Sequence, residues 1–69
     1  MSDIKAIERR VNDLTLLVQK ASPSDWVNLN YHTGCWHAST FHTNLKSYHE
    51  DPSEAVEGLG LLIGKLVHE

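Results

Sequence analysis

Apolar residues recur at alternating spacings of three and four along residues 2–21 of this 69-residue chain. This heptad spacing predicts an amphipathic helix with a narrow apolar seam, the kind of surface that pairs with another helix. Pro23 ends the helix because it has no N–H to donate and disfavours helical backbone at Ser22. We expect the seam to join this chain to another copy, and it consists of Ile4, Ile7, Val11, Leu14 and Val18.

The small size of the chain is a second reason to expect an oligomer of two or more subunits. A domain of 69 residues has a marginal core, and one cysteine, Cys35, cannot form a disulfide within the chain. Small scaffolds are commonly stabilised by a metal or by a partner subunit instead. The alternative is a single helix packed on the chain's own sheet. The apolar stripe widens at Leu16 and Leu17, where we expect that contact.

Residues 25–49 show the period-two alternation of a β-hairpin or short sheet. The run from Trp26 to Tyr31 alternates apolar with polar residues, and Gly34 supplies a turn before a second run from Cys35 to His42. Residues 45–49 can form a third strand. We therefore predict two or three antiparallel strands after the first helix.

A second helix is predicted over residues 52–68. Asp51 precedes Pro52 as an N-cap, and Glu54 stands where a capping box places its second acid. Three glycines, at positions 58, 60 and 64, lower helix propensity and indicate close approach of a neighbouring element. The sequence predicts one α+β domain over residues 1–69: a coiled-coil-like helix, a small antiparallel sheet and a C-terminal helix.

Aromatic residues and histidines concentrate in the central segment. If Val27 and Leu29 face the second helix, the opposite face of the sheet is a subunit interface or a ligand surface, because exposed Trp and Tyr are enriched in binding hot spots. The alternative is burial of this face by the first helix of the same or a neighbouring chain. The candidate surface for a partner or ligand consists of Trp26, Asn28, Asn30, Trp36, His37 and His42.

Four central residues superficially resemble a zinc ligand set, namely His32, Cys35, His37 and His42. Their spacing is poor for zinc, because His42 points away from Cys35 and His37 on a regular strand; His32, Cys35 and His37 could still meet at the turn. Cys35 with a nearby histidine could be a nucleophile–base pair, but no orienting third group stands out. We predict no catalytic residue, no metal, no cofactor and no enzymatic activity.

The charge distribution limits the partner classes. The net charge is -3, with residues 51–69 the most acidic part, and no basic stripe favours nucleic acid. No apolar run approaches the length of a membrane span, and the start of the sequence lacks the pattern of a signal peptide. With one cysteine, these features predict a cytoplasmic protein.

One weak family resemblance runs through residues 26–57. The segments W-V-N-L-N-Y, W-H-A and H-E-D-P-S-E-A-V resemble the strand-strand-helix module of HicB-like antitoxin domains and small phage or prophage proteins. The added first helix and the missing DNA-binding segment depart from that family. The resemblance implies a phage-type accessory protein that binds and modulates a host protein, possibly one of its defence proteins, from the host cytoplasm. The alternative function is an oligomer that sequesters a nucleotide-like ligand between subunits.

Overall fold

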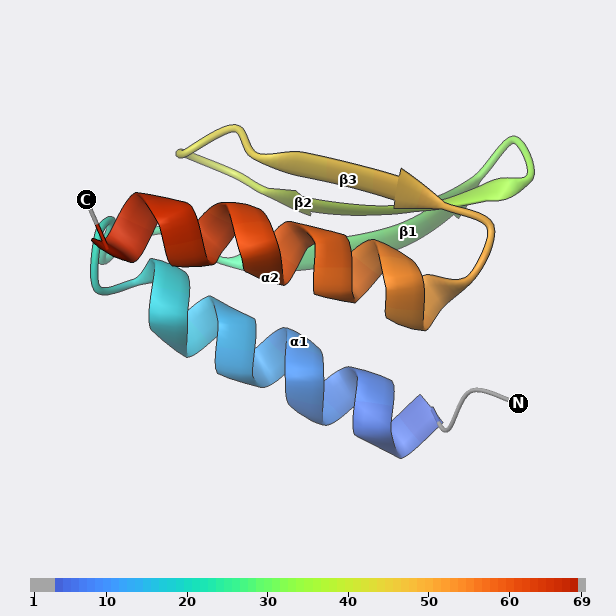
Figure 1. The fold of residues 1–69 in the computed structure, drawn as a ribbon, viewed down its shortest axis with the longest axis horizontal. Coiled ribbons are helices and arrows are strands. Elements are labelled where there is room, and N and C mark those ends of the chain that lie inside the picture. The colour runs from blue at the N-terminus through green and yellow to red at the C-terminus, as the bar shows by residue number, and fades with distance from the viewer. Residues whose placement is uncertain (1–3, 69) are drawn as a thin grey trace.

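The computed structural model describes residues 4–68 as one layer of helices on one small sheet. The elements are α1 (Ile4–Val18), β1 (Val27–His32), β2 (Cys35–Thr40), β3 (Lys46–His49) and α2 (Pro52–His68). The strands are antiparallel in the order β1-β2-β3, and both helices lie on the same side of the sheet (Figure 1). The predicted α+β class is therefore confirmed, and the third strand is present.

Two backbone turns join the strands. Thr33 and Gly34 have φ angles of 48° and 81°, and two successive positive values define the tight turn that matches strand twist between β1 and β2. The connection between β2 and β3 is longer and contains Asn44, with a φ of 57°. Both connections keep neighbouring strands antiparallel, so the face opposite the helices is continuous from β1 to β3.

The core fills the space between the helices and the sheet. It draws on both helices and on the first two strands, and its buried members are Leu14, Val18, Val27, Ala38, Ala55, Val56, Leu59 and Ile63. The helices run side by side in the same direction (Figure 1), and Arg10 of α1 pairs with Glu57 of α2 at 2.9 Å. Neither helix combines the length and the apolar character that crossing a membrane requires, within residues 4–68.

The apolar seam of α1 divides into two parts. Leu14 and Val18 are fully buried in the chain's own core, whereas Ile4 is 72% exposed and Ile7 and Val11 are half-buried. The half-buried side chain of Leu17 also packs on this core, as its position in the widened stripe suggests. Only the start of the seam therefore has surface to offer another chain, and pairing there remains a prediction.

The start of α2 has the predicted N-cap but a different reciprocal bond. Asp51 Oδ1 accepts hydrogen bonds from the N–H and the hydroxyl of Ser53, both at 2.9 Å. The backbone N–H of Asp51 is donated to His49 Nδ1 at 3.0 Å, where a capping box would use Glu54. His49 thus links the end of β3 directly to the start of α2.

The three glycines of α2 differ in what surrounds them. A Cβ at Gly58 would collide with the Ser47 hydroxyl of β3, and one at Gly60 would lie 3.3 Å from a Leu14 methyl of α1. A Cβ at Gly64 would meet open space. Close approach therefore accounts for Gly58 and Gly60, and the structure gives no packing reason for Gly64.

This difference predicts unequal effects of alanine at two positions of one helix. Gly64→Ala is expected to stabilise the protein by up to about 1 kcal/mol, since alanine favours helix over glycine. Gly58→Ala should be less stable than Gly64→Ala, because the new methyl group must displace the Ser47 hydroxyl. Urea denaturation monitored by circular dichroism measures both. Adding Ser47→Ala to Gly58→Ala should recover stability, and equal stability of the two single variants would contradict the account.

Candidate functional site

A buried carboxylate organises one end of the sheet. Asp25 is 1% exposed. Its Oδ1 accepts the N–H groups of Trp26, Phe41 and His42 at 2.8–2.9 Å. Its Oδ2 accepts the N–H and the hydroxyl of Thr43 at 3.0 and 2.7 Å. One side chain therefore ties the residue before β1 to the loop between β2 and β3.

The donors around Asp25 favour its ionised form. Burial raises the pKa of the Asp25 carboxyl, but the hydrogen bonds from His42, Thr43 and Phe41 outweigh burial and hold the pKa well below its ordinary value. The Thr43 hydroxyl has one proton, which it gives to Asp25, so the 2.6 Å contact with Thr40 is a hydrogen bond donated by Thr40. Thr40 Oγ1 in turn accepts the N–H of Leu45.

Three exposed rings belong to residues whose backbone N–H groups bond to this carboxylate. We call Trp26, Phe41 and His42 the ring cluster. The rings of Trp26 and Phe41 stack with centroids 4.5 Å apart and planes 17° apart. His42 meets both edge-on, 4.8 Å from Phe41 and 6.0 Å from Trp26. Trp26 is 41% exposed and Phe41 61% exposed. Since the three backbone N–H groups all bond to Asp25 Oδ1, the backbone that carries these exposed rings is fixed at one point, and the rings themselves contact one another.

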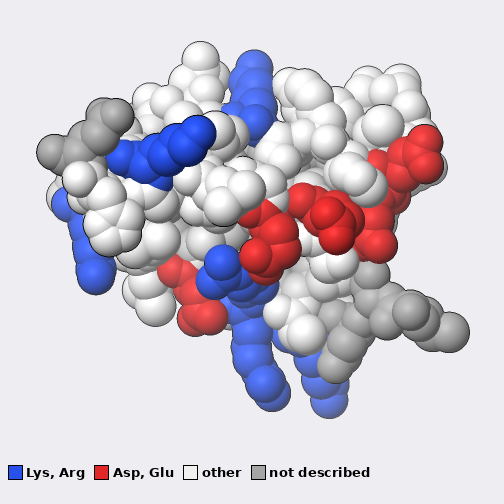
Figure 2. Space-filling view, viewed as in Figure 1, with Lys and Arg blue, Asp and Glu red and all other residues white. Residues whose placement is uncertain are grey.

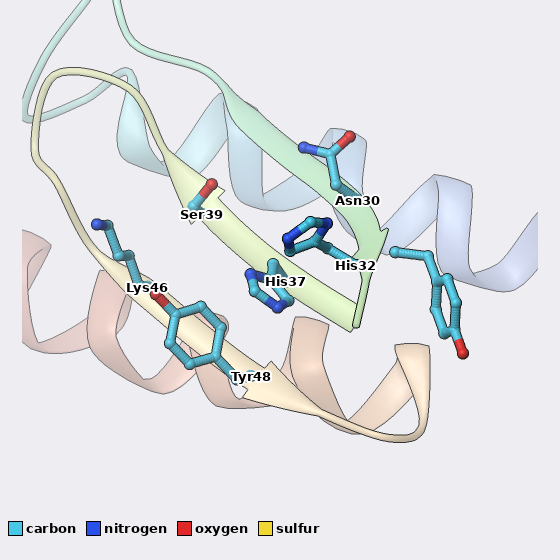
Figure 3. A pocket seen from close by; sticks show the side chains of 7 residues that line it. Asn30, His32, His37, Ser39, Lys46 and Tyr48 are labelled. Atoms are coloured by element: carbon cyan, nitrogen blue, oxygen red, sulfur yellow. The ribbon is translucent and has the colours of Figure 1, made fainter. Parts of the chain in front are cut away.

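The sheet surface that faces away from the helices, here called the open face, continues from strand to strand. The register brings Asn30 opposite His37, and His37 opposite Tyr48. His37 and Tyr48 have ring centroids 4.4 Å apart, and His32 lies 5.9 Å from His37. Figure 3 shows the labelled side chains pointing outward from all three strands, with the helices behind the sheet. They line a shallow hollow of about 500 Å³ together with Tyr31: Asn30, His32, His37, Ser39, Lys46 and Tyr48.

The structure divides the predicted partner surface. Asn28, Asn30 and His37 lie on the open face, while Trp26 and His42 belong to the ring cluster. Trp36 does not join them, because it pairs with Tyr31 on the opposite face and packs against the core. Three of the six residues thus lie on the open face, two lie in the ring cluster beyond the strand ends, and Trp36 lies on the helix side.

The residues considered for zinc do not gather at one point. His32 and Cys35 face each other beside the turn, and His37 lies next to them on the open face. His42 is in the ring cluster beyond the other end of β2. Across residues 4–68, no three or more His, Cys, Asp or Glu side chains are arranged to hold a metal ion.

Charged side chains are unevenly placed around the molecule. Figure 2 shows acidic side chains gathered over the start of α2 and basic side chains mainly along α1. Lys46 is the lysine of the open-face hollow, beside the rings of His37 and Tyr48. The open face is therefore lined chiefly by rings, amides and hydroxyls, with little fixed charge.

Several site residues were not predicted. Asp25 stands in a Ser-Pro-Ser-Asp run that indicated only a turn, and its buried role depends on donors 16 to 18 residues away. Phe41 and Tyr48 carry a signal that was present, since strand alternation places both on the face of His37. Lys46 lies at the start of a strand whose existence the sequence left open.

Comparison with known protein families, curated proteins and solved structures found no match to this chain. The weak resemblance to HicB-like modules therefore remains a hypothesis, and the site has to be interpreted from its own geometry.

Replacing Asp25 tests whether its carboxylate stabilises the fold. Asp25→Asn is expected to lower the free energy of unfolding by about 3 kcal/mol, because the new amide would direct a donor at the buried Thr43 N–H. Urea denaturation at pH 7 measures the loss. Asp13→Asn, which removes an exposed carboxylate from α1, is the matched control and should change stability by less than about 0.5 kcal/mol.

The same pair of variants tests the depressed pKa. The stability contributed by Asp25 is complete above the unfolded-chain pKa of about 3.9 and is lost as the pH falls toward the lower folded pKa. The stability gap between the wild type and Asp25→Asn should therefore narrow steadily below about pH 4. A gap of constant size between pH 7 and pH 2 would show that the charge of Asp25 is not responsible.

Proposed function

We propose that this chain is a non-enzymatic, oligomeric binding protein that engages a partner protein through the ring cluster and the adjoining open face. The observation that carries the proposal is the pair of exposed, stacked rings of Trp26 and Phe41, whose backbone N–H groups both bond to a buried carboxylate. Exposed aromatic side chains held in a fixed arrangement bind with little further loss of conformational freedom.

The shape of the surface favours a protein over a small molecule. The hollow at Asn30, His37 and Tyr48 is shallow and open, whereas small-molecule sites are typically enclosed and mostly apolar. Polar groups surrounding a few exposed rings are the usual composition of a protein interface. Following the resemblance of residues 26–57, the partner we propose is a host protein, for example one involved in defence, which a phage-type accessory protein would bind in the host cytoplasm.

Quantitative affinity capture tests this function when matched variants are compared. Tagged wild-type protein should enrich a defined protein from host lysate, and Phe41→Ala should reduce that enrichment at least tenfold, because it removes half of the exposed stack. Leu61→Ala, which truncates a residue 72% exposed on α2, is the control and should retain it. Equal capture by both variants, or no enriched protein, would contradict the proposal. Circular dichroism verifies that each variant is folded.

A second candidate function is sequestration of a nucleotide-like ligand in the open-face hollow. It is favoured by one specific arrangement: Lys46 lies in the same hollow as the His37–Tyr48 ring pair. A lysine can pair with a phosphate while neighbouring rings stack on a base. A twofold assembly could enclose such a ligand between subunits.

Thermal unfolding with nucleoside triphosphates separates the two candidates. A ligand present at 100 times its Kd should stabilise the folded protein by about 2.7 kcal/mol. Lys46→Ala should abolish the shift, whereas Lys65→Ala, on α2, should preserve it. If millimolar nucleotides cause no shift in thermal stability, this second function is excluded, and the proposal of a protein partner still stands.

A further inference from the structure

The outer edge of β1 is open for most of its length. β1 has six residues and lies at one side of the sheet, with β2 as its strand neighbour. α1 covers one end, where Thr15 Oγ1 accepts the Val27 N–H at 3.2 Å. Beyond that contact, a hollow of about 510 Å³ separates α1 from the strand, lined by Ile7, Glu8, Val11, Asn12, Val27, Asn28 and Leu29.

The backbone groups on this edge can be assigned from the Val27 contact. Because the Val27 N–H points outward to Thr15, the alternation of antiparallel pairing turns the N–H and C=O of Leu29 and Tyr31 outward as well. No backbone hydrogen bond within residues 4–68 uses these outward groups. The edge therefore presents two residues ready to pair with another strand.

The edge also lacks the usual protection against pairing. Exposed edge strands are commonly shortened or carry lysine, proline or inward-pointing charges. The other edge, β3, follows this rule with four residues and Lys46. β1 carries no proline and no lysine or acidic residue in its sequence VNLNYH. This asymmetry singles out β1 as the edge that pairs.

A second copy of the same strand fits these groups. When Leu29 of one copy faces Tyr31 of the other, a twofold axis passes between the two Asn30 residues and two hydrogen-bonded residue pairs form, each with two bonds. Val27 then keeps its bond to Thr15. A register centred on Leu29 needs the Val27 N–H, and one centred on Tyr31 brings Leu29 against the Thr33 turn. The Asn30 register is therefore the one that pairs the outward groups of both Leu29 and Tyr31 without breaking the Val27–Thr15 bond.

The surroundings of the edge complement this arrangement. Glu8 lines both hollows beside α1, and the register brings His32 of the second copy next to Asn28, at the rim that Glu8 and Asn28 share. An imidazole can donate to that carboxylate. The pairing is symmetric, so the contact occurs twice.

The exposed start of α1 can contribute further buried area to the interface. Strand pairing alone does not bury the roughly 800 Å² per partner typical of stable interfaces. A second, largely apolar hollow of about 330 Å³ continues from the first and supplies further area. It is lined by Ile4, Ile7, Glu8, Leu29, Trp36 and Pro52.

We infer that two copies of this chain pair antiparallel through β1, about a twofold axis at Asn30, to form one continuous six-stranded sheet. This inference rests on the oligomeric part of the proposed function and gives it a geometry. The two open faces then adjoin in one surface, with a ring cluster toward each end.

Disulfide trapping tests the register directly. In Cys35→Ser/Asn30→Cys, the two introduced thiols face each other across the axis with Cα atoms about 4.5 Å apart, a distance that a disulfide spans. Mild oxidation at micromolar concentration should convert most of this variant to a covalent dimer on a non-reducing gel. Cys35→Ser/Asn28→Cys is the control on the same face. Its two introduced cysteines would have Cα atoms about 14 Å apart, too far for a disulfide, so this variant should not form a covalent dimer. Circular dichroism confirms the fold of both.

Sedimentation velocity on the wild-type chain and on two lysine variants completes the test. The wild type should sediment as a dimer, and Asn30→Lys should raise the dimer Kd at least tenfold because two like charges meet at the axis. Leu61→Lys, at a residue 72% exposed on α2 and outside the β1 edge, should leave it within a factor of three. A dimer that neither crosslinks at Asn30 nor responds to Asn30→Lys would overturn pairing through β1 but keep the proposed oligomer. A monomeric wild type would overturn both.

Discussion

Five hydrogen bonds converge on the carboxylate of Asp25, and most of the molecule's distinctive surface depends on them. The donors come from Trp26, at the start of the sheet, and from the loop that follows β2. Gln19 adds a bond to the Asp25 carbonyl, which ties the end of α1 to the same point. A buried charge with fewer donors would be costly. With five, it fixes segments that have little apolar packing of their own.

This anchor matters because both helices cover the same side of the sheet (Figure 1). The helix side forms the core, centred on Leu14, Leu59 and Ile63. The opposite side has no covering layer among residues 4–68, so its rings are exposed, and β1 is left at an edge. A chain of this size has little apolar surface to spare for display. The exposed aromatic rings beside a buried carboxylate are therefore the feature on which the proposed binding role rests.

Periodicity along the chain predicted the elements well, because helix and strand patterns are local. The seven-residue repeat located α1, the Asp51-Pro52 start located α2, and alternation separated the two faces of β1 and β2. The sequence of α1 alone could not show which surface its apolar seam packs against. Leu14 and Val18 turned out to be buried by α2 and the sheet of the same chain. A narrow seam has the same sequence whether its neighbour is its own domain or another copy.

The site was less predictable than the fold for a similar reason. Asp25 looks like one more turn residue, because its donors follow it by as many as 18 positions and all but the Thr43 hydroxyl are backbone groups that any sequence carries. Trp36 looked like a surface aromatic beside His37, but adjacent strand residues point to opposite faces, and Trp36 packs on the core. Strand alternation could have placed Phe41 and Tyr48, whereas the contribution of Lys46 required the register between β2 and β3.

Amide hydrogen exchange at the donors to Asp25 tests most directly whether this carboxylate fixes the backbone that carries the exposed rings. If it does, the amides of Trp26, Phe41, His42 and Thr43 should exchange as slowly as those of the central strand β2, because they would be released only by global unfolding. The amide of Thr33, in the exposed turn, should exchange much faster. Exchange of the four donor amides as fast as that of Thr33 would contradict this expectation, because the loop would then open independently of the fold.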